Sequence, residues 1–131
     1  MSGFTDTLNE KIVNHFLRGQ SQTVGSSLFL GMFVADPLPE GQADEIAYSG
    51  YARQLVTFTS YNSTTNAITN LNGLVFPKYT GTSVQTVTYC AVFDSSTTPI
   101  MLLSGQVEIP AVLYPNEVVV WPVGELELVI A

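Results

Sequence analysis

The spacing of apolar residues changes once along the chain. In residues 5–18 they fall three or four apart, which is the spacing of one face of an α-helix. Thr7 and Glu10 have the spacing of an N-terminal capping box, and Gly19 is suited to end the helix. We therefore predict one helix over residues 5–18. Its apolar face holds Phe4, Leu8, Ile12, His15 and Phe16.

From residue 27 onward the pattern is one of strands and turns. Residues 28–34 are apolar on both parities, which indicates a strand buried on both faces, and residues 36–50 hold Pro, Gly and four acids, which indicates an exposed loop. Asn72-Gly73 is a two-residue hairpin signal, predicted to join the strands on either side of it. The segments that we expect as strands are 28–34, 51–59, 67–71, 74–76, 84–93, 100–109, 117–121 and 125–130.

About eight short strands behind one helix predict a mainly β protein, an antiparallel β-sandwich of jelly-roll type. The length of 131 residues suits a single domain over 1–131, with the helix at 5–18 and the β-sandwich over 27–131. A chain of this size can bury a hydrophobic core without disulfides or metals.

Composition and charge narrow the class of function. Only 11% of the residues are charged, against about 25% in ordinary soluble domains, so the surface must present neutral polar and apolar groups that other proteins can cover. The net charge is −7, with only four scattered bases, Lys11, Arg18, Arg53 and Lys78. Nucleic acid and anionic membranes are therefore not expected as partners. The N-terminus lacks the pattern of a signal peptide, and no apolar run is long enough to cross a membrane.

Candidate chemistry is sparse. One histidine, His15, and one cysteine, Cys90, cannot form a zinc site, and both suit structural positions, so we predict no cofactor and no metal. Glu125 and Glu127 share a strand face as paired carboxylates would, but they are more simply solubilising charges. A calcium site from acidic side chains would use Asp36, Glu40, Asp44 and Glu45, whose spacing matches no known loop. We expect no enzymatic activity.

Three features suggest contacts with other proteins instead. Arg53 lies in a strand, where it either pairs internally with a carboxylate or projects towards a partner. The apolar segment 111–115 is either a loop folded over the core or an exposed docking patch. The helix either covers an open end of the sandwich or reaches a neighbouring subunit.

The order of motifs resembles a known family. Gly50-Tyr51-Ala52-Arg53-Gln54 follows a strand that ends in Ala35-Asp36-Pro37, and precedes Val87-Thr88-Tyr89-Cys90-Ala91-Val92-Phe93-Asp94 and Trp121-Pro122-Val123-Gly124-Glu125-Leu126. Over nearly the whole chain this is similar to small structural proteins of tailed bacteriophages, often labelled tail fibre or virion proteins. The chain departs from that pattern at Ser83-Val84-Gln85, where the family often has a tryptophan and a glycine. The resemblance implies a component of the virion, made in the host cytoplasm.

The leading hypothesis is a capsid decoration (cement) protein that binds the major capsid protein as a symmetric homo-oligomer. A tail or tail-fibre adaptor that binds tail subunits is the close alternative. We expect partner contacts at Phe4, Leu8, Tyr51, Arg53 and Tyr114. A carbohydrate-binding module is a third hypothesis, which requires exposed aromatic rings in a row. The candidates for such a row are Trp121, Tyr48, Tyr61 and Tyr79.

Overall fold

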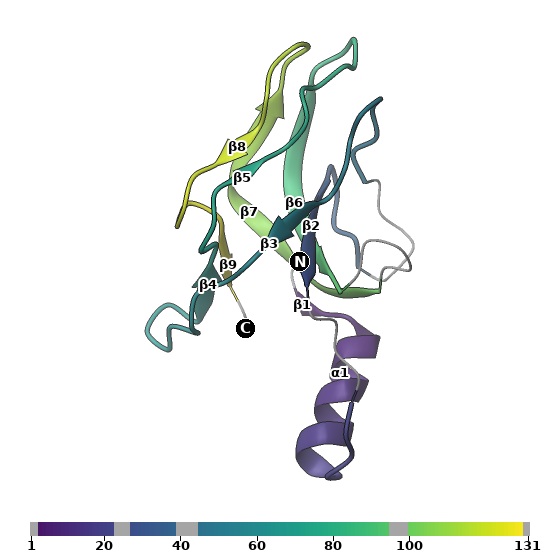
Figure 1. Cartoon of the computed structure of the whole chain (residues 1–131), viewed down its shortest axis with the longest axis vertical. Coiled ribbons are helices and arrows are strands. Elements are labelled where there is room, and N and C mark those ends of the chain that lie inside the picture. The colour runs from purple at the N-terminus through teal and green to yellow at the C-terminus, as the bar shows by residue number, and fades with distance from the viewer. Residues whose placement is uncertain (1–2, 23–26, 39–44, 95–99, 130–131) are drawn as a thin grey trace.

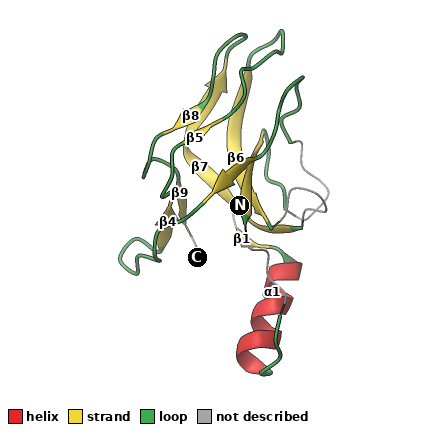
Figure 2. Ribbon diagram, in the orientation of Figure 1, coloured by secondary structure: helices red, strands yellow, loops and turns green. Residues whose placement is uncertain are grey.

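The computed structural model describes residues 3–22, 27–38, 45–94 and 100–129, and within them the protein is mainly β with one N-terminal helix (Figures 1 and 2). The strands are β1 (Gly3–Phe4), β2 (Leu28–Phe33), β3 (Gln54–Val56), β4 (Ala67–Thr69), β5 (Leu74–Val75), β6 (Gln85–Phe93), β7 (Met101–Leu113), β8 (Val120–Trp121) and β9 (Glu127–Val129). The helical segment consists of α1 (Asp6–Ile12) and a π-helical continuation, η1 (Val13–Leu17). The predicted fold class is confirmed: the sheets are antiparallel and one helix leads them.

A five-stranded sheet forms the first layer, in the order β1-β7-β6-β2-β3. The long β6 and β7 form its centre, and every pairing is antiparallel. The ladder between β6 and β7 is interrupted, because Val87 lies opposite Ala111 whereas Tyr89 lies opposite Gln106. Residues 107–110 therefore bulge out of the ladder, which bends β7 at this point.

Two short strand pairs, β4-β9 and β5-β8, form the second layer. Leu71 N–H donates to Thr57 O at 2.8 Å, which joins this layer to the chain that follows β3. The hairpin predicted at Asn72-Gly73 is wrong: its two strands pair with β9 and β8 and not with each other. A hairpin does form just before this site, where Asn62 pairs with Ala67. Asn66 turns the chain there with a φ of 55°.

The core lies between the two layers. Leu30 and Met32 of β2, with Val87, Cys90 and Val92 of β6, face the second layer and are fully buried. The second layer contributes Leu74, Phe76, Tyr79, Trp121, Leu126 and Leu128. The alternation predicted in the last strand is confirmed for residues 125–128, because Leu126 and Leu128 are buried, Glu125 is exposed and Glu127 is partly exposed. Ile130, which the same prediction included, lies outside the described residues. A smaller cluster of Phe33, Ala91 and Phe93 lies on the other face of the first sheet.

The N-cap of the helix lies two residues before the predicted one. Thr5 is the N-cap, and its Oγ1 accepts a hydrogen bond from Leu8 N–H at 3.2 Å. The capping box of Thr7 and Glu10 is therefore wrong, and Phe4 belongs to β1 and not to the helix. The predicted stop is confirmed: Gly19, with a φ of 65°, follows the last helical turn.

Two loop predictions need correction. Segment 111–113 belongs to β7, which runs through Pro110 to Leu113 and is longer than expected. Within the predicted loop 36–50, Ile46 is buried and Glu45 bridges to Phe33, because this segment returns to the edge of β2. Residues 39–44 of that loop lie outside the described residues. None of the helices in the described part of the chain has the length and apolar character needed to span a membrane.

Candidate functional site

An ion pair at the edge of the first sheet brings together two of the predicted contact residues. Arg53 donates from Nε to Glu45 Oε2 at 2.9 Å and from Nη2 to Glu45 Oε1 at 2.7 Å. The Tyr51 hydroxyl donates to the same Oε2 at 2.8 Å and accepts from Met32 N–H at 3.0 Å. The Arg53 guanidinium also lies 3.6 Å from the centre of the Phe93 ring. The internal pairing of Arg53 is thus the alternative that the structure shows.

Gly31 of β2 makes room for this network. A Cβ at Gly31 would lie 2.6 Å from Glu45 Oε2 and 3.3 Å from the Tyr51 hydroxyl. The glycine is therefore needed for steric reasons, since any side chain would displace the carboxylate that Arg53 binds.

Arg53 and Tyr51 each have one protonation state at neutral pH. The hydrogen bonds that Arg53 donates to Glu45 hold the pKa of Arg53 above its usual range. Burial, with the charge of Glu45 as the next cause, raises the pKa of the Tyr51 hydroxyl well above its usual range. Both groups keep their protons, so neither Arg53 nor Tyr51 supplies an acid or a base near neutral pH. About a quarter of each charged side chain remains exposed, 24% for Arg53 and 23% for Glu45.

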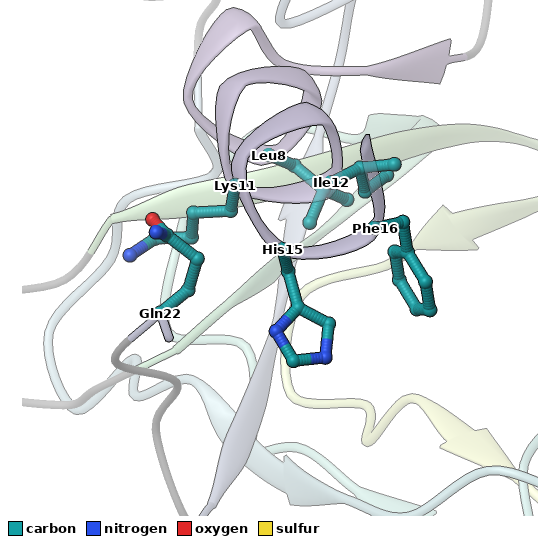
Figure 3. A pocket seen from close by; sticks show the side chains of 6 residues that line it. All are labelled: Leu8, Lys11, Ile12, His15, Phe16 and Gln22. Atoms are coloured by element: carbon teal, nitrogen blue, oxygen red, sulfur yellow. The ribbon is translucent and has the colours of Figure 1, made fainter. Parts of the chain in front are cut away.

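The helix is the second candidate site, because it extends beyond the sheets and buries none of its residues (Figure 1). Its far end exposes 74% of Phe16 and 78% of Leu17. One side of the helix forms a shallow apolar hollow of about 250 Å³ (Figure 3). The side chains around the hollow are Leu8, Lys11, Ile12, His15, Phe16 and Gln22.

The other predicted contact residues lie apart from one another. Phe4 lies in β1, where it pairs with Leu103 of β7, and it is half-buried at the base of the helix. Leu8 lies one turn further along and borders the hollow. Tyr114 is half exposed and follows the end of β7, far along the sheet from the helix. The structure thus brings Tyr51 and Arg53 together, places Phe4 and Leu8 near each other, and leaves Tyr114 separate.

Cys90 and His15 do not come together in a catalytic site. Cys90 is fully buried in β6, and burial raises the pKa of its thiol to about 12, so it does not ionise near neutral pH. His15 lies on the exposed end of the helix, in edge-on contact with Phe16. Among the residues that the structure describes, no three His, Cys, Asp or Glu side chains gather as metal ligands would. Of the acids considered for calcium, Glu40 and Asp44 lie outside the described residues, and Glu45 binds Arg53.

The aromatic row required for sugar binding is not present. Trp121 and Tyr79 are buried in the core, and Tyr48 is partly buried with its hydroxyl bonded to Pro77 O. Only Tyr61 of the four candidates is exposed, at 53%. These four residues therefore do not form the exposed aromatic row that the carbohydrate-binding hypothesis requires.

Two structural residues were missed in the sequence. The side chain of Asn70 is fully buried, donates to the carbonyl oxygens of Asn72 and Pro122, and accepts from Leu126 N–H at 2.9 Å. The sequence placed Glu45 in an exposed loop and among the acids of a hypothetical calcium site, and gave no sign of its pairing with Arg53. No local signal identifies either role, because the partners of each residue come from distant segments.

The described residues form a mainly β body with an exposed N-terminal helix, and the class of the protein follows from its match to a protein family. Residues 3–129 match the family model described as "Podophage GP4 fiber I protein gp80", and the chain belongs to this family. It is therefore a virion protein of a tailed phage, as the order of its motifs had indicated. No curated protein matches the chain.

Proposed function

We propose that this protein is a non-enzymatic subunit of the phage fibre apparatus, attached to a neighbouring virion protein through its N-terminal helix. The observation that carries the proposal is the exposed helix end with Phe16 and Leu17. The family description, which names a fibre protein, supports the location.

The physical argument concerns the stability of the helix. A helix of this length, with no residue buried in its own subunit, is marginal in water. Burying an aromatic or aliphatic side chain contributes about 1.5–3 kcal/mol. Phe16 and Leu17, together with the hollow beside Ile12, would supply such burial in a groove of the partner. The free subunit presents an apolar helix face, and the assembled particle covers it.

A capsid decoration protein is the second candidate. The small β body and the surface poor in charge would also suit a subunit that covers the capsid lattice as a symmetric oligomer and binds the major capsid protein. The two locations differ in stoichiometry, because a lattice offers many sites and a fibre attachment offers few.

The first experiment is the copy number of the protein in purified particles, measured by quantitative mass spectrometry against the major capsid subunit. We expect a ratio of a few per cent or less, which fits a fibre apparatus. A ratio near one, or another large simple fraction, would contradict the fibre location and support decoration of the capsid. Absence from the particles would contradict both.

The role of the helix is tested in the same particles with the double variant Phe16→Ser, Leu17→Ser. We expect incorporation to fall by about tenfold or more, which corresponds to about 1.4 kcal/mol, with an unchanged circular dichroism spectrum of the free protein. The matched control is Val84→Ser, which removes a residue that is 54% exposed at the opposite end of the β6–β7 pair. Normal incorporation of the double variant would refute the role of the helix.

A further inference from the structure

The two layers leave an open seam between β7 and β8. On its inner side β8 pairs with β5, and β7 pairs with β6. In the part of the chain that the structure describes, no strand pairs with the other edge of β8, and β1 covers the outer edge of β7 only at Leu103 and Ser104. No Cα atom of β8 lies within 8 Å of β7, whereas paired strands lie about 5 Å apart.

This seam contains a groove of about 250 Å³ with an apolar floor and an acidic rim. Val107, Trp121 and Leu126 form the floor, and each is at least nine-tenths buried. Ile109 and Val120 line the sides and are 80% and 51% exposed. Glu125 and Glu127 also line the groove.

The local sequence keeps the seam open. The bulge at residues 107–110 bends β7, and Pro110 has no N–H to donate to a ladder. On the other side, the turn at Val123-Gly124, where Gly124 has a φ of 81°, carries the chain away from β8 into β9. Bulges are common at sheet edges and next to functional sites, where they change the direction of a side chain or end the strand pairing.

We propose that the seam is a docking groove for an extended segment of another virion protein, which adds as a strand between β7 and β8. The unpaired backbone groups of two strand edges are suited to bind such a segment by main-chain hydrogen bonds. The apolar floor accepts alternate side chains of the segment, and Glu125 and Glu127 accept a Lys or Arg beside them. The inference rests on the proposed role as a virion subunit and adds a second, separate contact to that of the helix.

Charge identifies the occupant as a different protein and not a second copy of this chain. The chain has four bases against eleven acids, and one of the bases, Arg53, is bound by Glu45. A second acidic copy would meet like charge at the rim of the groove. A segment with alternating apolar residues and a basic residue is complementary to it.

The test is hydrogen–deuterium exchange of the wild-type chain, free and in purified particles, followed in peptides that cover residues 107–113 and 118–121. We expect the edge amides of these peptides to exchange at least tenfold more slowly in particles, which corresponds to about 1.4 kcal/mol. Peptides of the central β6 serve as the internal reference, protected in both states. Equal exchange of the seam peptides in the two states, with the protein present at its normal copy number, would overturn the groove and leave the fibre role intact.

A pair of variants separates the groove from the rest of the outer surface. Val75 and Val120 are directly opposed across β5 and β8 and are similarly exposed, at 57% and 51%, but only Val120 lines the groove. We expect Val120→Lys, and the double variant Glu125→Lys, Glu127→Lys, to reduce incorporation about tenfold or more, and Val75→Lys to leave it unchanged.

An equal loss of incorporation with Val75→Lys and Val120→Lys would overturn the proposed groove, because it would place the contact on the outer face of the β5–β8 pair. Exchange measured on the wild-type protein keeps the proposal testable if a variant does not fold. Absence of the wild-type chain from particles would overturn both this inference and the fibre role.

Discussion

At the scale of single residues, the best-defined feature is the contact of Glu45 with Arg53 and Tyr51 above Gly31. The carboxylate receives three hydrogen bonds from the two side chains. Such a pair contributes to stability only if its geometry is well fixed, because both charges are partly removed from water. Here the Phe93 ring holds the guanidinium of Arg53 from one side, and the lack of a side chain at Gly31 leaves room for the carboxylate of Glu45.

We expect Glu45→Gln and Gly31→Ala to lower the free energy of unfolding by about 1–3 kcal/mol each, since either change leaves partly buried donors without their acceptor. Because both act on the same carboxylate, the double variant should lose clearly less than the sum of the two. Urea denaturation measures all three values. The control is Glu125→Gln, an exposed carboxylate, which should change stability by about 0.5 kcal/mol or less. Additive losses would show that the glycine and the carboxylate act independently.

The sequence indicated half of this network. Tyr51 and Arg53 stand out because they belong to one recognisable strand motif. Glu45 does not, because it follows other acids in a segment with the composition of a solvent-exposed loop. Gly31 lies on a different strand, and its importance depends on a distance that only the folded chain defines.

At the scale of secondary structure, periodicity predicted several of the strands. It failed where side chains from distant segments determine how the strands pair. The strands β2, β6 and β9 lie where the sequence placed them. The Asn72-Gly73 hairpin fails because Asn70 ties the chain to the β8–β9 turn, and because Asn72 accepts from Thr57 N–H and donates to Leu55 O. These bonds hold residues 70–72 against the chain around β3 and against the β8–β9 turn, and the strands on either side pair with β9 and β8.

The N-cap of the helix gives an element-scale prediction. Thr5 Oγ1 accepts from Leu8 N–H and donates to Met101 O at 2.8 Å, so it both starts the helix and fastens it to β7. We expect Thr5→Val to destabilise the helix by about 1 kcal/mol, the usual cost of a lost cap, and to raise the exchange rates of amides from Leu8 to Leu17 several-fold. Exchange measured by NMR on the free protein tests this.

The matched control for the cap is Thr7→Val, the residue that sequence spacing favoured. It should leave the exchange rates in the helix nearly unchanged, because Val and Thr have similar helix propensities and Thr7 is not the cap. Equal effects of the two variants would contradict the assigned cap. Exchange in β6 should not respond to either change, since the helix buries no core residue.

At the scale of the whole molecule, charge and apolar surface act in opposite directions. The chain carries a net charge of −7 with a pI near 4.2, and it exposes Phe16, Leu17 and Ile109 almost fully. Repulsion between like-charged copies opposes contact through these residues in the free protein. Stability of the dispersed subunit before assembly thus depends on its ionised carboxylates.

We therefore expect self-association of the free protein to strengthen when salt is added at pH 7.5, because screening weakens the repulsion while the apolar contacts are unaffected. Sedimentation velocity should show a rise in mean mass from low to high salt, with the association constant increasing on the order of tenfold. Near-ultraviolet circular dichroism of Trp121, measured in parallel, should stay constant if the fold is intact. The Phe16→Ser, Leu17→Ser variant should associate less at high salt, because it lacks the two exposed apolar side chains at the helix end. An unchanged mean mass between low and high salt, with an unchanged dichroism spectrum, would show that charge repulsion does not hold the free subunits apart.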